Sequence, residues 1–162
     1  MKEYRFTIND SVIYKRIASE SGFTALARKS AGHPDTLLKL TAITEDEKGF
    51  LDNYIPIAIN ECAAEITRYL APCNVTEEAE ILHSEHMAHT FIFIQPDNFP
   101  DECLKAISDI VMEIVTYSIL QQWYILVKSD DANNCALRLQ TLDSQLRKLL
   151  SIRKKPSSIN TL

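Results

Sequence analysis

The stretch ISDIVMEIVTYSILQQWYILV, residues 107–127, decides the fold class of this chain. Its apolar residues recur at helical spacing but cover more than one stripe, so the helix they form must pack against neighbours on several sides. Pro100 fits the first position of this helix, with Asp101 and Glu102 favourable at its positive end. Two acids and two glutamines interrupt the stretch, and a bilayer interior would penalise each of them. We therefore predict a central helix of a folded domain and not a membrane span.

Near the end of this helix stands the aromatic pair Trp123 and Tyr124. Large aromatic side chains supply much of the buried area of protein cores and of interfaces. We expect both residues to be core or interface aromatics, and we take them as candidate interaction residues.

A further helix follows the acidic break at residues 129–131. Its apolar residues alternate in spacing between four and three, which makes a seam for another helix: Cys135, Leu139, Leu142, Leu146 and Leu149. We predict that the seam packs on the central helix as an antiparallel hairpin. The final residues 153–162, RKKPSSINTL, form a basic, polar tail that we predict to be disordered unless a partner holds it. Arg153, Lys154 and Lys155 are therefore candidate docking residues.

Upstream, the sequence Thr44-Glu45-Asp46-Glu47 matches the capping box, in which the Thr44 and Glu47 side chains satisfy backbone amides reciprocally. Helical spacing of apolar residues begins there and continues to Pro72. Pro56 lies inside this run, where it removes a hydrogen bond and crowds a carbonyl. We predict a long helix with a kink or a break near Pro56.

A shorter helix is expected before it. Residues 9–11 supply N-cap candidates, and Gly22 is a suitable end. The helix would carry three apolar residues inward: Val12, Ile13 and Ile17. The stretch before it, YRFTI, is short and suits an extended conformation. From Phe23 to Thr41 the apolar residues keep no settled period, so we predict an exposed loop.

The stretch HTFIFI, residues 89–94, is rich in aromatic and β-branched residues and is closed by Gln95-Pro96, so it predicts a strand. Its natural partner is EAEIL, residues 78–82, with the turn at residues 84–87. The fold that we predict is mainly α, with about four helices and one β-hairpin near residues 77–95 inserted between the second and third helices. A single domain would span residues 1–152.

Three of the four histidines gather at the tip of this hairpin, at His83, His86 and His89. In an extended chain, residues 83 and 89 share one face, while residue 86 points the other way or lies in the turn. The three imidazoles therefore do not converge on one ion, and a polar hairpin tip is the favoured interpretation. They remain weak candidates for a metal site.

The charge of the chain argues against a dedicated nucleic-acid binder. Its formal net charge is −5, whereas such proteins gain affinity by neutralising phosphates. Acidic residues dominate residues 41–80 and basic residues crowd the C-terminal end, which suits contacts between neighbouring copies. The chain has no G-x-S-x-G, Gly-rich phosphate loop or H-E-x-x-H motif. We therefore expect a protein that is not an enzyme and that needs no cofactor.

The four cysteines lie far apart, with no C-x-x-C spacing. Free, buried thiols are favoured over disulfides or metal ligands, above all for Cys62 and Cys135, which sit where helical patterns place core residues. Charge within the first ten residues leaves no apolar leader segment. We expect the protein to act in the cytoplasm.

The order of these elements resembles that of a known class of proteins. A capped acidic helix (TEDEKGFLDNYIPIAINECAAEITRYL), a hairpin ending in FIFIQPDNF, a helix ending in SILQQWYILVKSDDA and a last helix running into LRKLLSIRKKP look like small virion proteins of tailed phages and prophages of the Bacteroides group. More distantly, the chain resembles the head-to-tail connector (adaptor) proteins that form a ring beneath the portal. The histidine-rich hairpin departs from that pattern.

The resemblance implies a non-catalytic structural protein that assembles into a ring or other homo-oligomer, with portal or tail components as partners. It would be found in the virion, or in the bacterial cytoplasm during assembly. Two alternatives stay open. One is a cytoplasmic binding or regulatory protein that dimerises through its C-terminal helices, and the other is a metal-binding protein that uses the hairpin histidines.

Overall fold

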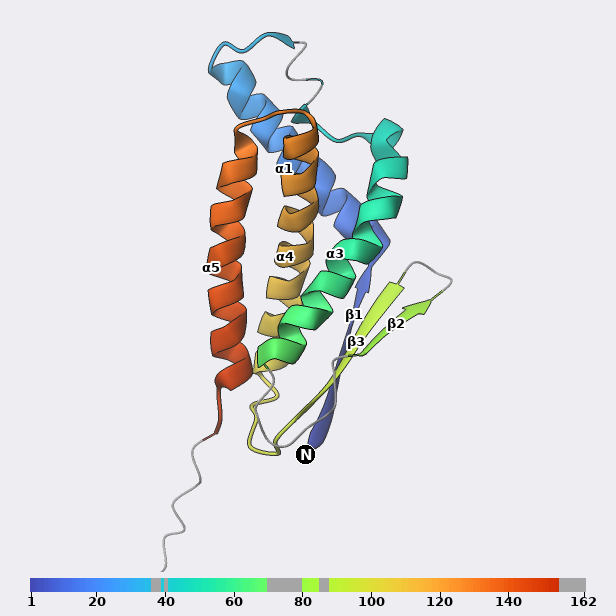
Figure 1. Cartoon of the computed structure of the whole chain (residues 1–162), viewed down its shortest axis with the longest axis vertical. Helices are drawn as coiled ribbons and strands as arrows, with labels where there is room; N and C mark the ends of the chain where they lie inside the picture. Colours follow the sequence, from blue (N-terminus) through green and yellow to red (C-terminus); the bar gives the residue numbers. More distant parts are fainter. Residues whose placement is uncertain (36–38, 40, 70–79, 85–87, 155–162) are drawn as a thin grey trace, which may run out of the picture.

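The computed structural model describes residues 1–35, 39, 41–69, 80–84 and 88–154. The chain begins with strand β1 (Lys2–Asn9) and helix α1 (Asp10–Ser30), followed by a 3-10 turn (Glu45–Glu47) and helix α3 (Lys48–Tyr69). Strands β2 (Glu80–Ser84) and β3 (Ala88–Gln95) come next, and helices α4 (Cys103–Leu126) and α5 (Asp131–Ser151) complete the fold. The mainly α fold with a hairpin between two pairs of helices is confirmed (Figure 1).

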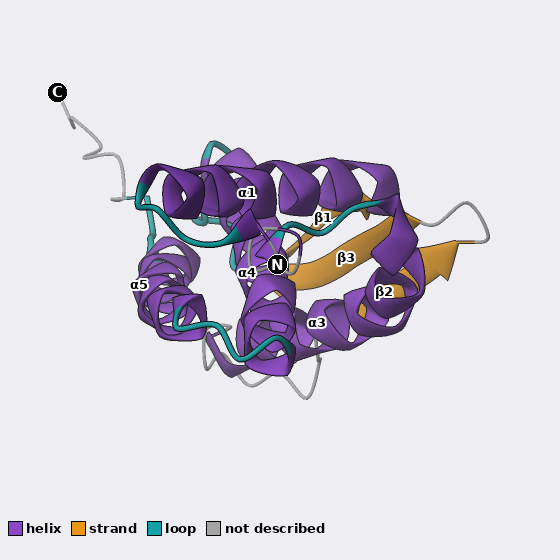
Figure 2. Cartoon of the chain, turned by 90° about the horizontal axis from the view of Figure 1, so that it is seen from above, coloured by secondary structure: helices purple, strands orange, loops and turns teal. Residues whose placement is uncertain are grey.

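Helix α4 is the centre of the molecule, as its apolar pattern predicts. It packs against α5, α3, α1 and β1, and Figure 2 shows it between α1 on one side and α3 on the other. Its inward residues are fully buried: Ile107, Val111, Val115, Ile119 and Leu120. Helix α5 lies antiparallel beside it (Figure 1), so the predicted helical hairpin is also confirmed. No helix among the described residues is long and apolar enough to cross a membrane.

The sheet has three antiparallel strands in the order β1-β3-β2. The predicted hairpin is present, with Ser84 opposite Ala88, while its turn at residues 85–87 lies outside the described residues. Strand β1 pairs with β3 along its whole length, from Lys2 opposite Gln95 to Asn9 opposite Ala88. This pairing joins residues distant in sequence, so the local pattern of YRFTI suggested an extended segment but not its partner.

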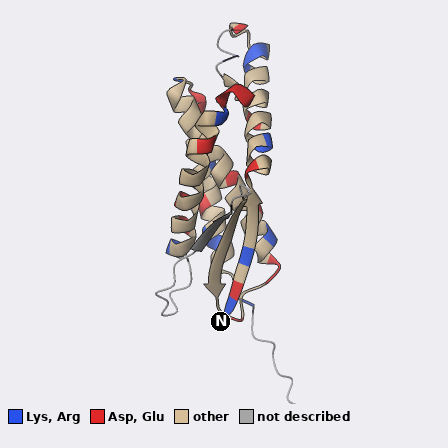
Figure 3. Ribbon diagram, turned by 90° about the vertical axis from the view of Figure 1, so that its right-hand side faces the viewer, with Lys and Arg blue, Asp and Glu red and all other residues tan. Residues whose placement is uncertain are grey.

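One face of the sheet is covered by the helices. Buried and exposed residues alternate along β1, as expected for a strand with one face in the core. Aromatic rings fill that face: Phe6 stacks on Phe91 with ring centroids 4.8 Å apart, and Tyr4 meets the edge of Phe99 at 5.1 Å. The residues of β1 that alternate with these buried ones are exposed and include Glu3 and Arg5, and Figure 3 shows charges of both signs along this strand.

Helix α1 is longer than the sequence predicts. It runs past Gly22 to Ser30, so the predicted end at Gly22 and the predicted loop from residue 23 are wrong as far as residue 30. An interior glycine costs a helix only about 1 kcal/mol relative to alanine. Packing offsets that cost here, because Ile13, Ile17 and Ser21 are buried. The Ser21 hydroxyl also accepts a hydrogen bond from the Ile43 amide at 2.9 Å.

The capping box at the start of α3 is confirmed. The Glu47 carboxylate accepts from the Thr44 amide at 2.7 Å, and the Thr44 hydroxyl accepts from the Asp46 amide at 3.3 Å. Helix α3 then continues through Pro56 without interruption, so a break at this proline is wrong. Figure 1 shows the first, teal turns and the later, green turns of α3 pointing in different directions, as a kink would produce.

Candidate interaction surfaces

Of the three hairpin histidines, the structure describes the side chain of His89 alone, and it places that side chain in the core. His89 is buried in β3, and its Nε2 lies 2.6 Å from an oxygen of Asp10, the first residue of α1. Its role is therefore to tie β3 to the start of α1. His83 is opposite His89 in the strand register, but its side chain and all of His86 lie outside what the structure describes. Within the described part of the chain, no group of three or more His, Cys, Asp or Glu side chains is placed to hold a metal ion.

Trp123 and Tyr124 are both buried in this chain's own core. The Trp123 indole donates a hydrogen bond to the Thr41 carbonyl at 3.2 Å and meets the edge of the Phe50 ring at 5.2 Å. Burial raises the pKa of Tyr124 to about 12. We expected these two residues to lie either in the core or at an interface. Both lie in the core, and neither offers a surface to a partner.

The start of the basic tail is held by the chain itself. The Arg153 guanidinium donates to the Gln95 side chain at 3.2 Å and lies over the Phe99 ring. The Lys154 amide donates to the Asn98 carbonyl at 2.7 Å. Residues 153 and 154 therefore belong to the folded domain, which the sequence prediction ended at residue 152. Lys155 and the rest of the tail lie outside the described residues.

Cys62 and Cys135 are free and buried, as the sequence predicts, and Cys103 is free and half-buried. Burial raises the pKa of the Cys62 thiol, and it raises that of Cys135 to about 11. Both groups are protonated at neutral pH, which makes them poor nucleophiles and poor metal ligands. Cys73 lies outside the described residues.

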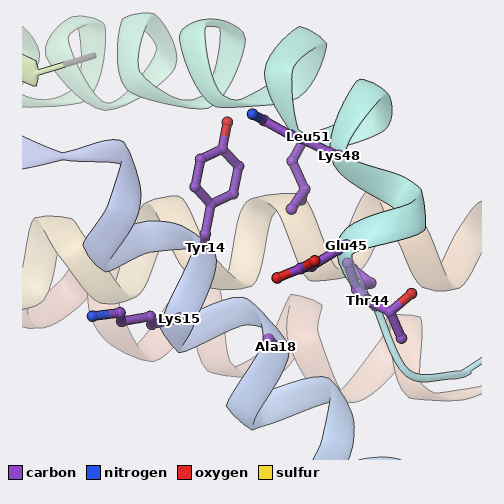
Figure 4. Close-up of a pocket in the computed structure, with 8 residues that line it drawn as sticks. Tyr14, Lys15, Ala18, Thr44, Glu45, Lys48 and Leu51 are labelled. Carbon is purple, nitrogen blue, oxygen red and sulfur yellow. The ribbon is translucent and has the colours of Figure 1, made fainter. Parts of the chain in front are cut away.

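A cleft of about 740 Å³ opens between α1 and the start of α3 (Figure 4). Tyr14 and Lys15 reach it from α1, and Glu45 and Lys48 reach it from the other wall. The Tyr14 hydroxyl donates a hydrogen bond to Asp52. Burial, reinforced by this bond, raises the pKa of Tyr14, so the phenol stays protonated and cannot act as a base.

The outward face of α1 carries three large apolar side chains: Val12, Phe23 and Leu26. They are 46%, 67% and 60% exposed, respectively. At 100° per residue they fall within about 60° of one another around the helix axis, so they form one line, which we name the α1 stripe. Val12 was predicted to point inward, and this prediction is wrong, because the buried face is supplied by Ile13 and Ile17.

A groove runs between α3 and α5 over the surface of α4. It consists of two adjoining clefts of about 360 and 460 Å³ that share Glu61, Ser118 and Leu139. Its charged lining residues are all acidic: Glu61, Glu65 and Asp143. Burial raises the pKa of Glu65, and the charge of Asp143 adds to this effect against the opposing influence of Arg68. We name this feature the acidic groove.

Neither surface was found by reading the sequence. The α1 stripe was missed because residues 23–30 were predicted as a loop. The acidic groove is assembled from three helices distant in sequence, although the excess of acids in residues 41–80 was a partial signal for its α3 wall. Comparison with known proteins finds no family model, no curated protein and no solved structure that matches the chain.

Proposed function

We propose that this chain is a non-catalytic structural protein of the head-tail connector type, from a tailed phage or prophage, which assembles into a ring through contacts between neighbouring copies. The observation that carries the proposal is the α1 stripe. Full burial of a large apolar side chain gains about 1.5–3 kcal/mol, so three such residues on one helix face strongly favour docking against another surface. Phe23 and Leu26 adjoin each other on this face, and Val12 lies further along it, beyond the exposed Ser19. Exposed apolar side chains gathered on one helix face are typical of an interaction site.

Two other parts of the molecule are less suited to self-association. The seam of α5 packs on α4 of the same chain, with Leu142 and Leu146 buried, which makes it less suited to the dimer that the regulatory hypothesis requires. The edge strand β1 carries charges on its exposed face, and Lys2 is paired with Asp101 at 2.8 Å. Such charges protect sheet edges against pairing with other strands.

The net charge of −5 also fits a ring through which DNA passes. An acidic wall repels phosphates and does not retain the strand. Portal and tail components are the proposed partners above and below the ring, and the virion, or the bacterial cytoplasm during assembly, is the proposed location.

The proposal is tested by the mass of the purified protein, measured by light scattering over a concentration series. The wild-type chain should form closed oligomers of several copies. The double variant Phe23→Glu/Leu26→Glu should be monomeric, because two charges in the stripe would have to be desolvated on docking. Leu137→Glu is the matched control, since Leu137 is an equally exposed leucine, 63%, on α5, and this variant should assemble like the wild type. A wild-type chain that remains a monomer, or stops at a dimer, at every concentration contradicts the proposal.

A further inference from the structure

We infer that the α1 stripe of one copy docks in the acidic groove of the next copy, as a helix in a groove. This inference rests on the proposed function and names the two surfaces that would make the ring contact. It commits to a second copy of this chain as the occupant of the groove.

The charges of the two surfaces are complementary. Lys15 and Lys29 are exposed on α1, and at 100° per residue both lie on the same flank of the stripe, about 20–60° from Leu26. Neither ammonium group forms an ion pair with a described residue. The groove contains acids only, and Glu61 is likewise without an ion pair within the described part of the chain. Glu65, by contrast, is paired with Arg68 at 3.0 Å. Docking would therefore place these lysines beside the unpaired Glu61 carboxylate, which fixes orientation as well as adding affinity.

The dimensions of the surfaces also agree. From Val12 to Leu26 the stripe is about 21 Å long, at 1.5 Å per residue. The α3 wall of the groove runs from Tyr54 to Glu65, which is about 17 Å on the same basis. Ile57, half exposed on that wall, offers apolar surface to the stripe. An amphipathic helix that lays its apolar face in such a groove is a recurrent mode of recognition.

The placement of the two surfaces decides what the contact can build. Figure 2 shows α1 on one side of α4 and α3, which forms a wall of the groove, on the other. A stripe and a groove on opposite sides cannot both be satisfied within a two-fold dimer. Each added copy leaves one stripe and one groove free, so the contact is heterologous and generates a ring if the rotation closes.

The test mixes two variants that each lack one surface. The stripe variant is Phe23→Glu/Leu26→Glu, and the groove variant is Ile57→Glu/Ala64→Glu, in which both substituted residues are exposed on the α3 wall. Each variant alone should self-associate at least about 100-fold more weakly than the wild type. An equimolar mixture should form a heterodimer and stop there, because only one intact stripe and one intact groove remain. Circular dichroism and melting curves should show that both variants are folded.

The outcomes separate this inference from the proposed function. A groove variant that assembles like the wild type overturns the inference and leaves the connector proposal standing. A mixture that stays monomeric, although both variants are folded, also overturns the inference. A wild-type chain that never assembles overturns the proposed function instead.

Discussion

The helices α1 and α5 are equally long, 21 residues each, but they distribute their apolar residues differently. On α5 the buried residues form one seam that faces α4: Cys135, Leu142, Leu146 and Leu150. On α1 the apolar residues are divided, with Ile13 and Ile17 in the core and the α1 stripe facing outward. The comparison teaches that α5 buries most of its apolar side chains within the monomer, apart from Leu137, whereas α1 leaves three large apolar side chains exposed.

Truncating one leucine on each helix should reveal the largest difference between α1 and α5. Leu146→Ala on α5 removes a fully buried side chain and should lower the free energy of unfolding by about 2–5 kcal/mol. Leu26→Ala on α1 should change it by no more than about 0.5 kcal/mol in the monomer, because the side chain is largely exposed. Urea unfolding at low protein concentration measures both. If Leu26→Ala destabilises the monomer as much as Leu146→Ala does, the stripe is part of the fold and not a docking surface.

A smaller effect is expected where α1 is anchored to the sheet. Asp10→Ala removes the carboxylate beside the buried His89 and leaves that imidazole without this partner. The loss should be about 1–3 kcal/mol of unfolding free energy, visible as a lower Tm. Ser11→Ala, an exposed change in the same helical turn, is the control and should leave Tm nearly unchanged. Equal Tm values for the two variants would show that the start of α1 is held by its apolar contacts alone.

The division of the apolar residues of α1 between the core and the surface explains where prediction from the sequence succeeded and where it failed. Residues 107–127, the seam of α5 and the capping box at Thr44 each carry a local signal that points to one structure. The helix and the capping box were confirmed, and the seam was confirmed at Cys135, Leu142 and Leu146, while Leu139 and Leu149 are only half-buried and Leu150 is buried in addition. Helix α1 places apolar residues both inward and outward, so its second half shows no clean helical period. Without that period, Gly22 looked like a helix end.

The candidate site could not be predicted for a different reason. A groove exists only once α3, α4 and α5 are packed together, and no stretch of the chain encodes it locally. The aromatic residues singled out as interaction candidates, Trp123 and Tyr124, were drawn into the core by the same packing. Size and aromaticity favour a core and an interface equally, and the position in the fold decides between them.

The smallest predicted effect concerns the groove itself. The pKa of Glu65 is raised in the folded chain, chiefly by burial. At a pH between the ordinary pKa of glutamate and this raised pKa, the folded chain therefore binds more protons than the unfolded chain. The contribution of Glu65 to stability is therefore present at acid pH and is lost as pH rises through its folded pKa. Glu65→Gln should therefore raise the free energy of unfolding at pH 7 by about 0.3 kcal/mol, with a slightly higher Tm. The effect is small because the Glu65 side chain is 31% exposed and solvent screens its charge.

Melting curves at pH 4 and pH 7, with Glu61→Gln as the exposed neighbour in the same groove, check this expectation; a lower Tm for Glu65→Gln at pH 7 contradicts it. In the proposed contact between copies, Glu65 would also couple docking to pH. A lysine docked beside Glu65 would lower the pKa of this carboxyl group. At any pH at which Glu65 of the unassembled chain is still protonated, docking would therefore release a proton. Association of the wild type should then tighten as pH rises through the raised pKa of Glu65, while Glu65→Gln should lose this dependence.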